Sequence, residues 1–370
     1  MDNLFFEKFD KPFILVIGVG EGGCNALQHV YKQNKSKALD FCAIDTDVHA
    51  LNSIDIPSER KLLIGEERLN GFGAASKPVQ GELAAMENVS KINEFLEGDY
   101  TIAFVLTGMG GGTGTGASPV IARLCWELDI FTIGVLSTPF TTEGSKRKNV
   151  AMEGVNKIKA YTDSVFLFSN DYIFNKYPEI KISESFSYSD AIFKQPIDFI
   201  TRIMTQFGYI DIDFSDVKSV LADSCFSTVD YGEAEGENRI DSALEQILQS
   251  PFISNVNLSE VKNILINLEA GEVEVEIAEI NEVLDFMKKS MGEDIDIIWG
   301  VGYDESLGSK LRLTVMLSSL KEVLVEEVAN PEGPEKKIVL QRQEYHGKTT
   351  SFVIIQFGND KNWGVEILSD

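Results

Sequence analysis

The glycine- and threonine-rich run at residues 108–116, GMGGGTGTG, restricts the fold and function of this chain more than any other feature. It follows residues 101–107 (TIAFVLT), which are typical of a buried parallel strand, and precedes residues 117–128, which have helical spacing. Glycines let the backbone approach an anion closely, successive N–H groups can surround it, and the threonine hydroxyls can donate to phosphate or bind its cation. No lysine follows, so the run is not a Walker P-loop. It predicts a different phosphate-binding loop.

A second glycine cluster lies at residues 18–23 (GVGEGG), after the apolar run 13–18 and before a helix predicted at 24–35. It fits the G-x-G-x-x-G pattern of dinucleotide-binding folds, and Asp45 or Asp47 stands roughly where a ribose-binding acid belongs. Taken alone, this cluster leaves open an NAD-dependent oxidoreductase or a turn with only a structural role. The oxidoreductase interpretation does not explain residues 108–116, and the sequence offers no evident histidine for hydride chemistry.

Strands and helices are predicted to alternate along the first half. Further strands are expected at 40–44 and 130–136, and helices at 81–97 and 144–161. This alternation builds a doubly wound α/β sheet whose ligands lie at the carboxyl ends of the strands. A long helix at 184–207 contains Pro196, which should kink it or remove a hydrogen bond. A smaller α/β domain with a mixed sheet is expected from the segments 237–249, 261–268, 276–291, 294–302 and 311–317.

Composition excludes several classes of function. The 370 residues suffice for two domains, and a net charge of −25 argues against nucleic-acid binding. No apolar stretch reaches the roughly 18 residues of a membrane helix, so direct membrane insertion is not expected. The 4 cysteines lack C-x-x-C spacing and only 3 histidines are present, so no protein-ligated metal site is predicted. The N-terminus is acidic where a signal peptide would be basic, so we expect a cytoplasmic protein.

The G-G-G-T-G-T-G order at residues 110–116 resembles the signature loop of FtsZ and, more distantly, of tubulin, and the resemblance runs from about Ile14 to Leu317. It implies a GTPase that binds GTP or GDP with Mg²⁺ on the phosphates and polymerises head to tail into cytoskeletal filaments in cell division. The implied organisation is a Rossmann-like GTP-binding domain (12–183), a central connecting helix (184–207), a C-terminal activation domain (208–318), and a linker with an atypical tail (319–370).

The resemblance also assigns the nucleotide contacts. Residues 71–78 resemble the loop that closes over the γ-phosphate, and residues 139–147 resemble the ribose loop. The contacts expected along the phosphates and ribose come from Gly20, Glu21, Gly22, Gly23, Cys24, Asn25, Asp47, Gly73, Ala74, Gly108, Met109, Gly110, Gly111, Gly112, Thr113, Gly114, Thr115, Gly116, Pro139, Glu143 and Arg147. Of these, Glu143 is expected on the sugar hydroxyls.

Three later residues match those that recognise guanine in the family. Asn170 matches the asparagine that reads the base edge, and Phe186 matches the residue that stacks on the base. Asp190 is expected to accept from the N1–H and the 2-amino group of guanine. Adenine lacks these donors, so the acid would select GTP over ATP.

An acidic loop after the long helix matches the catalytic loop that one FtsZ subunit inserts into the nucleotide pocket of the next. Asp213 and Asp216 are expected to orient and polarise the attacking water with Asp211 as a helper, and positioning of this kind suits phosphoryl transfer. Taken by themselves, acids at this spacing would also complement a helix N-terminus.

Some positions depart from the family pattern. Asp45 and Asp211 stand where asparagine is usual, and Cys24 stands where glycine is frequent. The extra acids motivate an alternative function, a nucleotide-gated FtsZ-like scaffold with weak or no hydrolysis. The expected partners are other copies of the chain, and membrane-tethering or division proteins through the tail. That tail differs from the family's terminal peptide: residues 351–355 and 363–367 are predicted to pair as strands.

Overall fold

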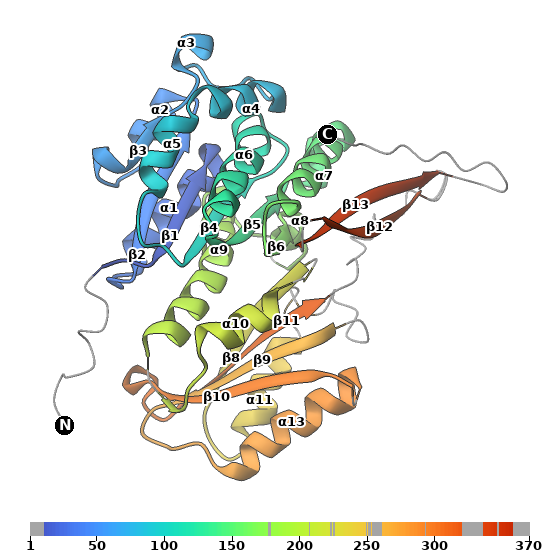
Figure 1. Ribbon diagram of the computed structural model, residues 1–370. Helices are drawn as coiled ribbons and strands as arrows, with labels where there is room; N and C mark the ends of the chain where they lie inside the picture. The colour runs from blue at the N-terminus through green and yellow to red at the C-terminus, as the bar shows by residue number, and fades with distance from the viewer. Residues whose placement is uncertain are drawn as a thin grey trace.

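The computed structural model describes residues 11–176, 179–206, 208–222, 224, 226–248, 250, 253, 261–292, 294–319, 336–345 and 348–357. Most of its strands join one sheet of 11 strands, in the order β3-β2-β1-β4-β5-β6-β8-β11-β9-β10-β7 (Figure 1). The predicted α/β fold with a doubly wound domain and a mixed second sheet is confirmed.

The first six strands of this order are parallel and form the N-terminal half of the sheet. They are β1 (Ile14–Val19), β2 (Leu39–Asp45), β3 (Lys61–Leu63), β4 (Ile102–Gly108), β5 (Phe131–Thr138) and β6 (Ser164–Ser169). Each residue of β1 is buried, as expected for a central parallel strand covered by helices on both faces.

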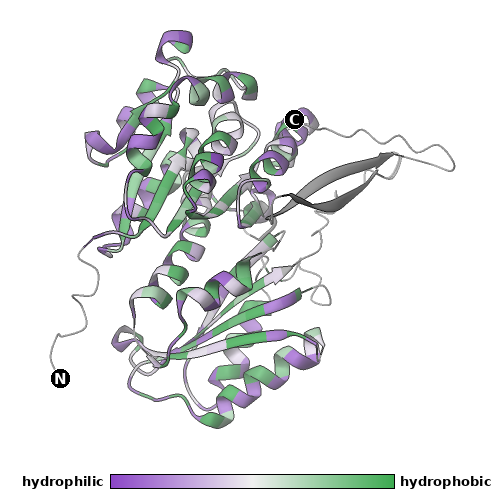
Figure 2. Cartoon of the chain, viewed as in Figure 1, coloured by the Kyte–Doolittle hydropathy of each residue, from purple (hydrophilic) through white to green (hydrophobic). Residues whose placement is uncertain are grey.

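Helices cover both faces of this sheet. They are α1 (Gly20–Gln33), α2 (Val48–Ser53), α3 (Glu66–Leu69), α4 (Pro78–Glu87), α5 (Val89–Leu96), α6 (Thr113–Glu127), α7 (Ser145–Lys159) and α8 (Asp171–Lys176), with short 3₁₀ turns η1 (Ser58–Arg60) and η2 (Thr141–Glu143). Alternate residues of β1 enter two different cores: Val16 packs with α1, and Ile17 packs with α4 to α7. Figure 2 shows the apolar residues concentrated on the strands between these layers.

The long helix α9 (Ile182–Thr205) runs from the N-terminal sheet toward the C-terminal one (Figure 1). It continues through Pro196, and its Phe193, Ile197 and Ile200 belong to the same core as α1. The mixed C-terminal part contains β7 (Gly208–Ile210), α10 (Phe214–Leu221), β8 (Phe226–Ala234), α11 (Arg239–Leu248), β9 (Val261–Ala270), α13 (Ile277–Met291), β10 (Asp296–Tyr303), η4 (Glu305–Leu307) and β11 (Leu311–Ser319).

Three predicted helices differ from those observed. Residues 81–97 form two helices rather than one, because the chain leaves helical geometry at Asn88, whose side-chain amide donates to the Ala84 carbonyl at 2.8 Å. The helices predicted from residues 24 and 117 begin at Gly20 and Thr113 instead. The last residues of each cluster, 20–23 and 113–116, are therefore the first turn of a helix, whereas residues 109–112 form the loop that precedes α6.

The C-terminal prediction also needs correction. Residues 351–355 lie in β13 (Lys348–Phe357), which pairs antiparallel with β12 (Lys336–Tyr345) in a separate sheet. β12 falls inside the segment expected to be a linker. The predicted partner strand, 363–367, lies outside the described residues.

Candidate functional site

The two glycine clusters meet at the carboxyl ends of neighbouring strands. β1 and β4 are parallel, with Val19 opposite Thr107, and each runs directly into its glycine cluster. Gly20 has a φ of +70°, and a Cβ placed on it would lie 2.8 Å from the Gly114 nitrogen. At Gly23, a Cβ would lie 2.1 Å from the Leu106 carbonyl oxygen. Only glycine allows the two clusters to approach this closely.

The second cluster has one position that faces open space. A Cβ on Gly112 would lie 2.7 Å from the Ala74 Cβ, and one on Gly110 would lie 3.0 Å from the Arg147 Cγ. A Cβ on Gly111 would meet no atom within 4 Å. Neither α1 nor α6 has a side-chain N-cap hydrogen bond. The first turns of these helices are therefore suited to an anion that accepts from the backbone.

Other predicted residues of these clusters differ in exposure. Glu21 and Asn25 are exposed, whereas Met109 is buried in the core beneath α7 and offers only its backbone. The Cys24 thiol donates to the Gly18 and Ile44 carbonyls, and burial raises its pKa well above the ordinary value. At this position the cysteine therefore stabilises the loop and is not reactive.

Residues 45–47 join β2 to both predicted phosphate loops. The Thr46 and Thr113 hydroxyls lie 2.5 Å apart, and Gly73 N donates to the Thr46 carbonyl at 3.1 Å. Asp47 Oδ1 caps α2, and its Oδ2 would lie 3.6 Å from a Cβ on Gly73. Burial raises the pKa of Asp45 to about 6. The 71–78 loop therefore lies beside the glycine clusters.

The predicted ribose residues lie beside the second cluster. Arg147 Nη1 pairs with Glu143 Oε2 at 3.0 Å, and Glu143 Oε1 accepts from the Phe140 N–H at 2.9 Å. Asp171, absent from the predicted set, accepts from the Thr141 N–H at 2.7 Å and from the Thr141 hydroxyl. In the sequence, only its position directly after Asn170 indicated that Asp171 could belong to the site. Asp171 therefore fixes the predicted ribose loop to the segment that contains Asn170.

Asn170, one of the predicted base-reading residues, lies beside the N-terminal half of α9, which carries the other two. Ser189 Oγ donates to Asn170 Oδ1 at 3.3 Å, which places Asn170 beside the helix position preceding Asp190. Burial raises the pKa of Asp190 to about 6. The Phe186 side chain lies outside the described residues.

The acidic loop forms the start of α10. Asp213 Oδ1 accepts from Asp216 N at 3.0 Å, and Asp216 Oδ2 accepts from Asp213 N at 2.9 Å, which is a reciprocal capping box. Asp211 Oδ1 accepts from Gly208 N at 2.7 Å. Each acid thus has one oxygen in a local backbone contact. Asp213 and Asp216 therefore do cap the helix N-terminus, as one interpretation of their spacing predicted.

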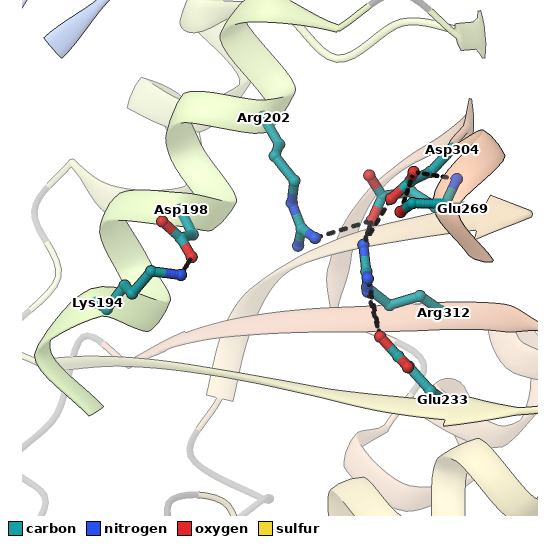
Figure 3. A network of polar contacts seen from close by, with 8 residues as sticks. Lys194, Asp198, Arg202, Glu233, Glu269, Asp304 and Arg312 are labelled. Carbon is teal, nitrogen blue, oxygen red and sulfur yellow. Dashed lines mark hydrogen bonds and ion pairs between the residues drawn. The ribbon is translucent and has the colours of Figure 1, made fainter. Parts of the chain in front are cut away.

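An ion-pair network fixes the end of α9 to the C-terminal sheet near this loop (Figure 3). Glu269, 1% exposed on β9, lies 3.6 Å from Arg202 of α9 and 3.5 Å from Arg312 of β11. Arg312 also pairs with Glu233 and Asp304. A cavity of about 20 Å³ is lined by Arg202, Glu269 and Asp211. The network therefore sets where the acidic loop leaves the long helix.

Within one molecule, much of the length of α9 lies between the acidic loop and the predicted base-reading residues. Asp190 is near the start of α9, whereas Asp211 follows its end at Thr205. At 1.5 Å per residue, the helix separates the two ends by about 22 Å. The loop and the pocket of one molecule therefore do not form a single site.

Comparisons with known proteins agree with this geometry. Residues 13–178 match the model of the tubulin/FtsZ family GTPase domain, and residues 226–321 match that of the FtsZ family C-terminal domain. The chain belongs to the tubulin/FtsZ family. It is a GTPase of this family, and its N-terminal domain binds GTP and GDP.

Individual relatives cover most of the chain. Cell division protein FtsZ 1 of Thermococcus kodakarensis is 33% identical over 88% of this chain and 86% of its own length. Cell division protein FtsZ of Porphyromonas gingivalis is 33% identical over 85% of this chain and 69% of its own. The solved FtsZ dimer of M. jannaschii has a TM-score of 0.75 at 27% identity, and the match covers 88% of this chain and 96% of that one. Within the described residues, no helix has the length and apolar character needed to span a membrane.

Proposed function

We propose that this FtsZ-family GTPase polymerises head to tail and completes its hydrolytic site at the junction between subunits. The proposed cellular role of the polymer is in cell division. The observation that carries the proposal is the separation of the acidic loop from the pocket by the length of α9. A loop that cannot serve its own pocket can serve that of the next molecule. Such a contact joins two different surfaces, so it generates a filament unless it closes into a ring. The matched structure from M. jannaschii is itself named a dimer.

In this proposal the acidic loop positions the attacking water. The capping box uses one oxygen of Asp213 and one of Asp216, so each carboxylate keeps a second oxygen for a water molecule. Asp211 is the helper, held by Gly208 N. Because phosphoryl transfer depends mainly on positioning and charge compensation, a borrowed pair of carboxylates can complete the site.

Mg²⁺ would be held mainly by the phosphates. No cluster of three or more His, Cys, Asp or Glu side chains suited to a metal occurs in the part of the chain that the structure describes. Mg²⁺ usually takes one or two protein ligands together with phosphate oxygens, and Thr113, in the first turn of α6, is suited to supply one. The ion would supply charge neutralisation on the phosphates.

Within the same proposal, the predicted contacts bind the nucleotide at the glycine clusters, the ribose loop and the start of α9. The boundaries at residues 183, 207 and 318 divide the chain into the GTP-binding domain, connecting helix and activation domain. Binding of membrane-tethering or division proteins by residues 319–370 remains a prediction.

The preference for GTP over ATP is expected to be lost at acid pH. Only the ionised Asp190 carboxylate accepts from both guanine donors, and burial raises its pKa to about 6. The preference is therefore present above that pKa and lost as the pH falls through it. Competition binding of GTP against ATP at about pH 7.5 and about pH 5 measures the ratio, in which effects on the shared triphosphate cancel. Asp190→Asn should show a low, pH-independent ratio, and an undiminished preference in that variant would remove the assignment.

The proposed function is tested by phosphate release from GTP and Mg²⁺ against protein concentration, with sedimentation of the same samples. The proposal predicts that turnover and GTP-dependent pelleting appear together above a threshold concentration. Pelleting without turnover would favour the scaffold alternative. Turnover that is strictly proportional to protein concentration, without pelleting, would contradict a site shared between subunits.

A further inference from the structure

Asp45 carries a buried oxygen without a hydrogen-bond partner. The side chain is 2% exposed at the end of β2, and Oδ1 accepts from Thr46 N at 2.7 Å and from Asp47 N at 3.3 Å. Oδ2 is buried and has no hydrogen-bond partner among the described residues. A buried carboxylate oxygen left in this state is costly, so a donor or a positive charge is expected to compensate it.

The Thr46–Thr113 hydroxyl pair is the neighbouring source of a donor. The two oxygens lie 2.5 Å apart and either can donate, so one of the two hydroxyl protons remains for another acceptor. Thr46 brings this pair next to Asp45, because its N–H donates to Asp45 Oδ1 while its hydroxyl contacts that of Thr113. Burial raises the pKa of Asp45, and the Thr113 hydroxyl opposes that rise. If Thr46 donates to Thr113 and Thr113 donates to Oδ2, both protons are used. The Thr113 oxygen then presents a lone pair and no proton to the phosphate pocket.

We infer that Asp45 is a positioning residue that turns the Thr113 hydroxyl into a ligand for the divalent cation of the bound nucleotide. The inference rests on the nucleotide site of the proposed function. A hydroxyl that only accepts suits Mg²⁺ and cannot donate to a phosphate oxygen, so the cation becomes necessary for tight binding. The asparagine usual in the family would place an amide donor beside Thr113. That amide would donate to the Thr113 oxygen, so the Thr113 proton would point toward the phosphate. Nucleotide affinity would then depend less on the cation.

The test compares binding of fluorescent mant-GTP to the full chain in excess Mg²⁺ and in EDTA, by anisotropy. The Mg²⁺ factor is the Kd in EDTA divided by the Kd in Mg²⁺. We expect this factor to be about ten times larger for the wild-type protein than for Asp45→Asn, which corresponds to a difference of about 1.4 kcal/mol. Thr113→Val, which removes the hydroxyl, should also show the smaller factor. Asp99→Asn is the matched control, since Asp99 is exposed before the amino end of β4 and its loss makes the same change in net charge. It should behave as the wild type does.

The outcomes separate this inference from the proposed function. Equal Mg²⁺ factors for the wild type, Asp45→Asn and Thr113→Val would overturn the role of Asp45 while leaving GTP binding intact. A reduced factor in Asp99→Asn as well would show a general charge effect and would also overturn it. If the wild type bound no mant-GTP even with Mg²⁺, the nucleotide site and this inference would both be wrong.

Discussion

Asp213→Asn is expected to bind GTP with wild-type affinity but to hydrolyse it about 100-fold more slowly, because it loses a carboxylate that positions and polarises water. Asparagine caps helices as well as aspartate does, so the bond to Asp216 N and the start of α10 should be retained. The variant therefore separates the charge of Asp213 from its capping role. Phosphate release per subunit, measured at a concentration where the wild type sediments, gives the result.

A second capping box in the same domain provides the control. Glu276 and Glu279 cap α13 with the same reciprocal geometry, at the start of a different helix. Glu276→Gln should leave hydrolysis unchanged. Wild-type turnover in Asp213→Asn, or an equal loss in Glu276→Gln, would show that the acids of the loop serve only to begin a helix.

Two glycine-to-alanine changes in the second cluster are expected to separate protein stability from nucleotide binding. A Cβ at residue 116 would lie 1.9 Å from the Pro78 carbonyl oxygen, so Gly116→Ala must push α4 away from α6. It should lower the free energy of unfolding by about 3 kcal/mol. A Cβ at residue 111 meets nothing within 4 Å, so Gly111→Ala should change stability by less than about 0.5 kcal/mol.

For nucleotide binding the expected order is reversed, and Gly111→Ala should have the larger effect of the two variants. The open space at Gly111 is where we expect a phosphate, so its alanine variant should weaken mant-GTP binding about tenfold or more. Urea denaturation and anisotropy on both variants give the two quantities. Normal GTP affinity in stable Gly111→Ala protein would mean that the phosphates lie elsewhere.

The parts of the fold that sequence predicted well are those where one physical cause dominates. Buried parallel strands such as residues 14–19 are uninterrupted apolar runs, and glycines between strand and helix have few structural uses without a ligand. Predictions failed where tertiary contacts decided the outcome. Gly20 and Thr113 begin helices despite low local propensity, because each helix must start within contact distance of the other cluster. Asn88 ends a helix by a side-chain bond that periodicity does not reveal.

The candidate site divides in the same way. Motif order was sufficient to name the loops, but it could not show which atoms in them lack partners. The sequence marks Asp45 as a candidate ribose-binding acid and as an extra acid where asparagine is usual. The structure shows that it has a buried oxygen without a partner, next to a pair of hydroxyls. Asp171 was missed because its role depends on a loop that lies 30 residues away in sequence.

Mixing two variants, each deficient in a different half of the site, tests the shared site most directly. Asp213→Asn retains its nucleotide pocket, and Gly111→Ala retains its acidic loop. In a head-to-tail polymer of equal amounts, about a quarter of the junctions pair an intact pocket with an intact loop. At a GTP concentration well below the Kd of the Gly111→Ala pocket, phosphate release from either variant alone should be low. We predict that release from the mixture recovers to about that fraction of the wild-type rate. A mixture that co-sediments but is no more active than its separate components would contradict a hydrolytic site built from two subunits.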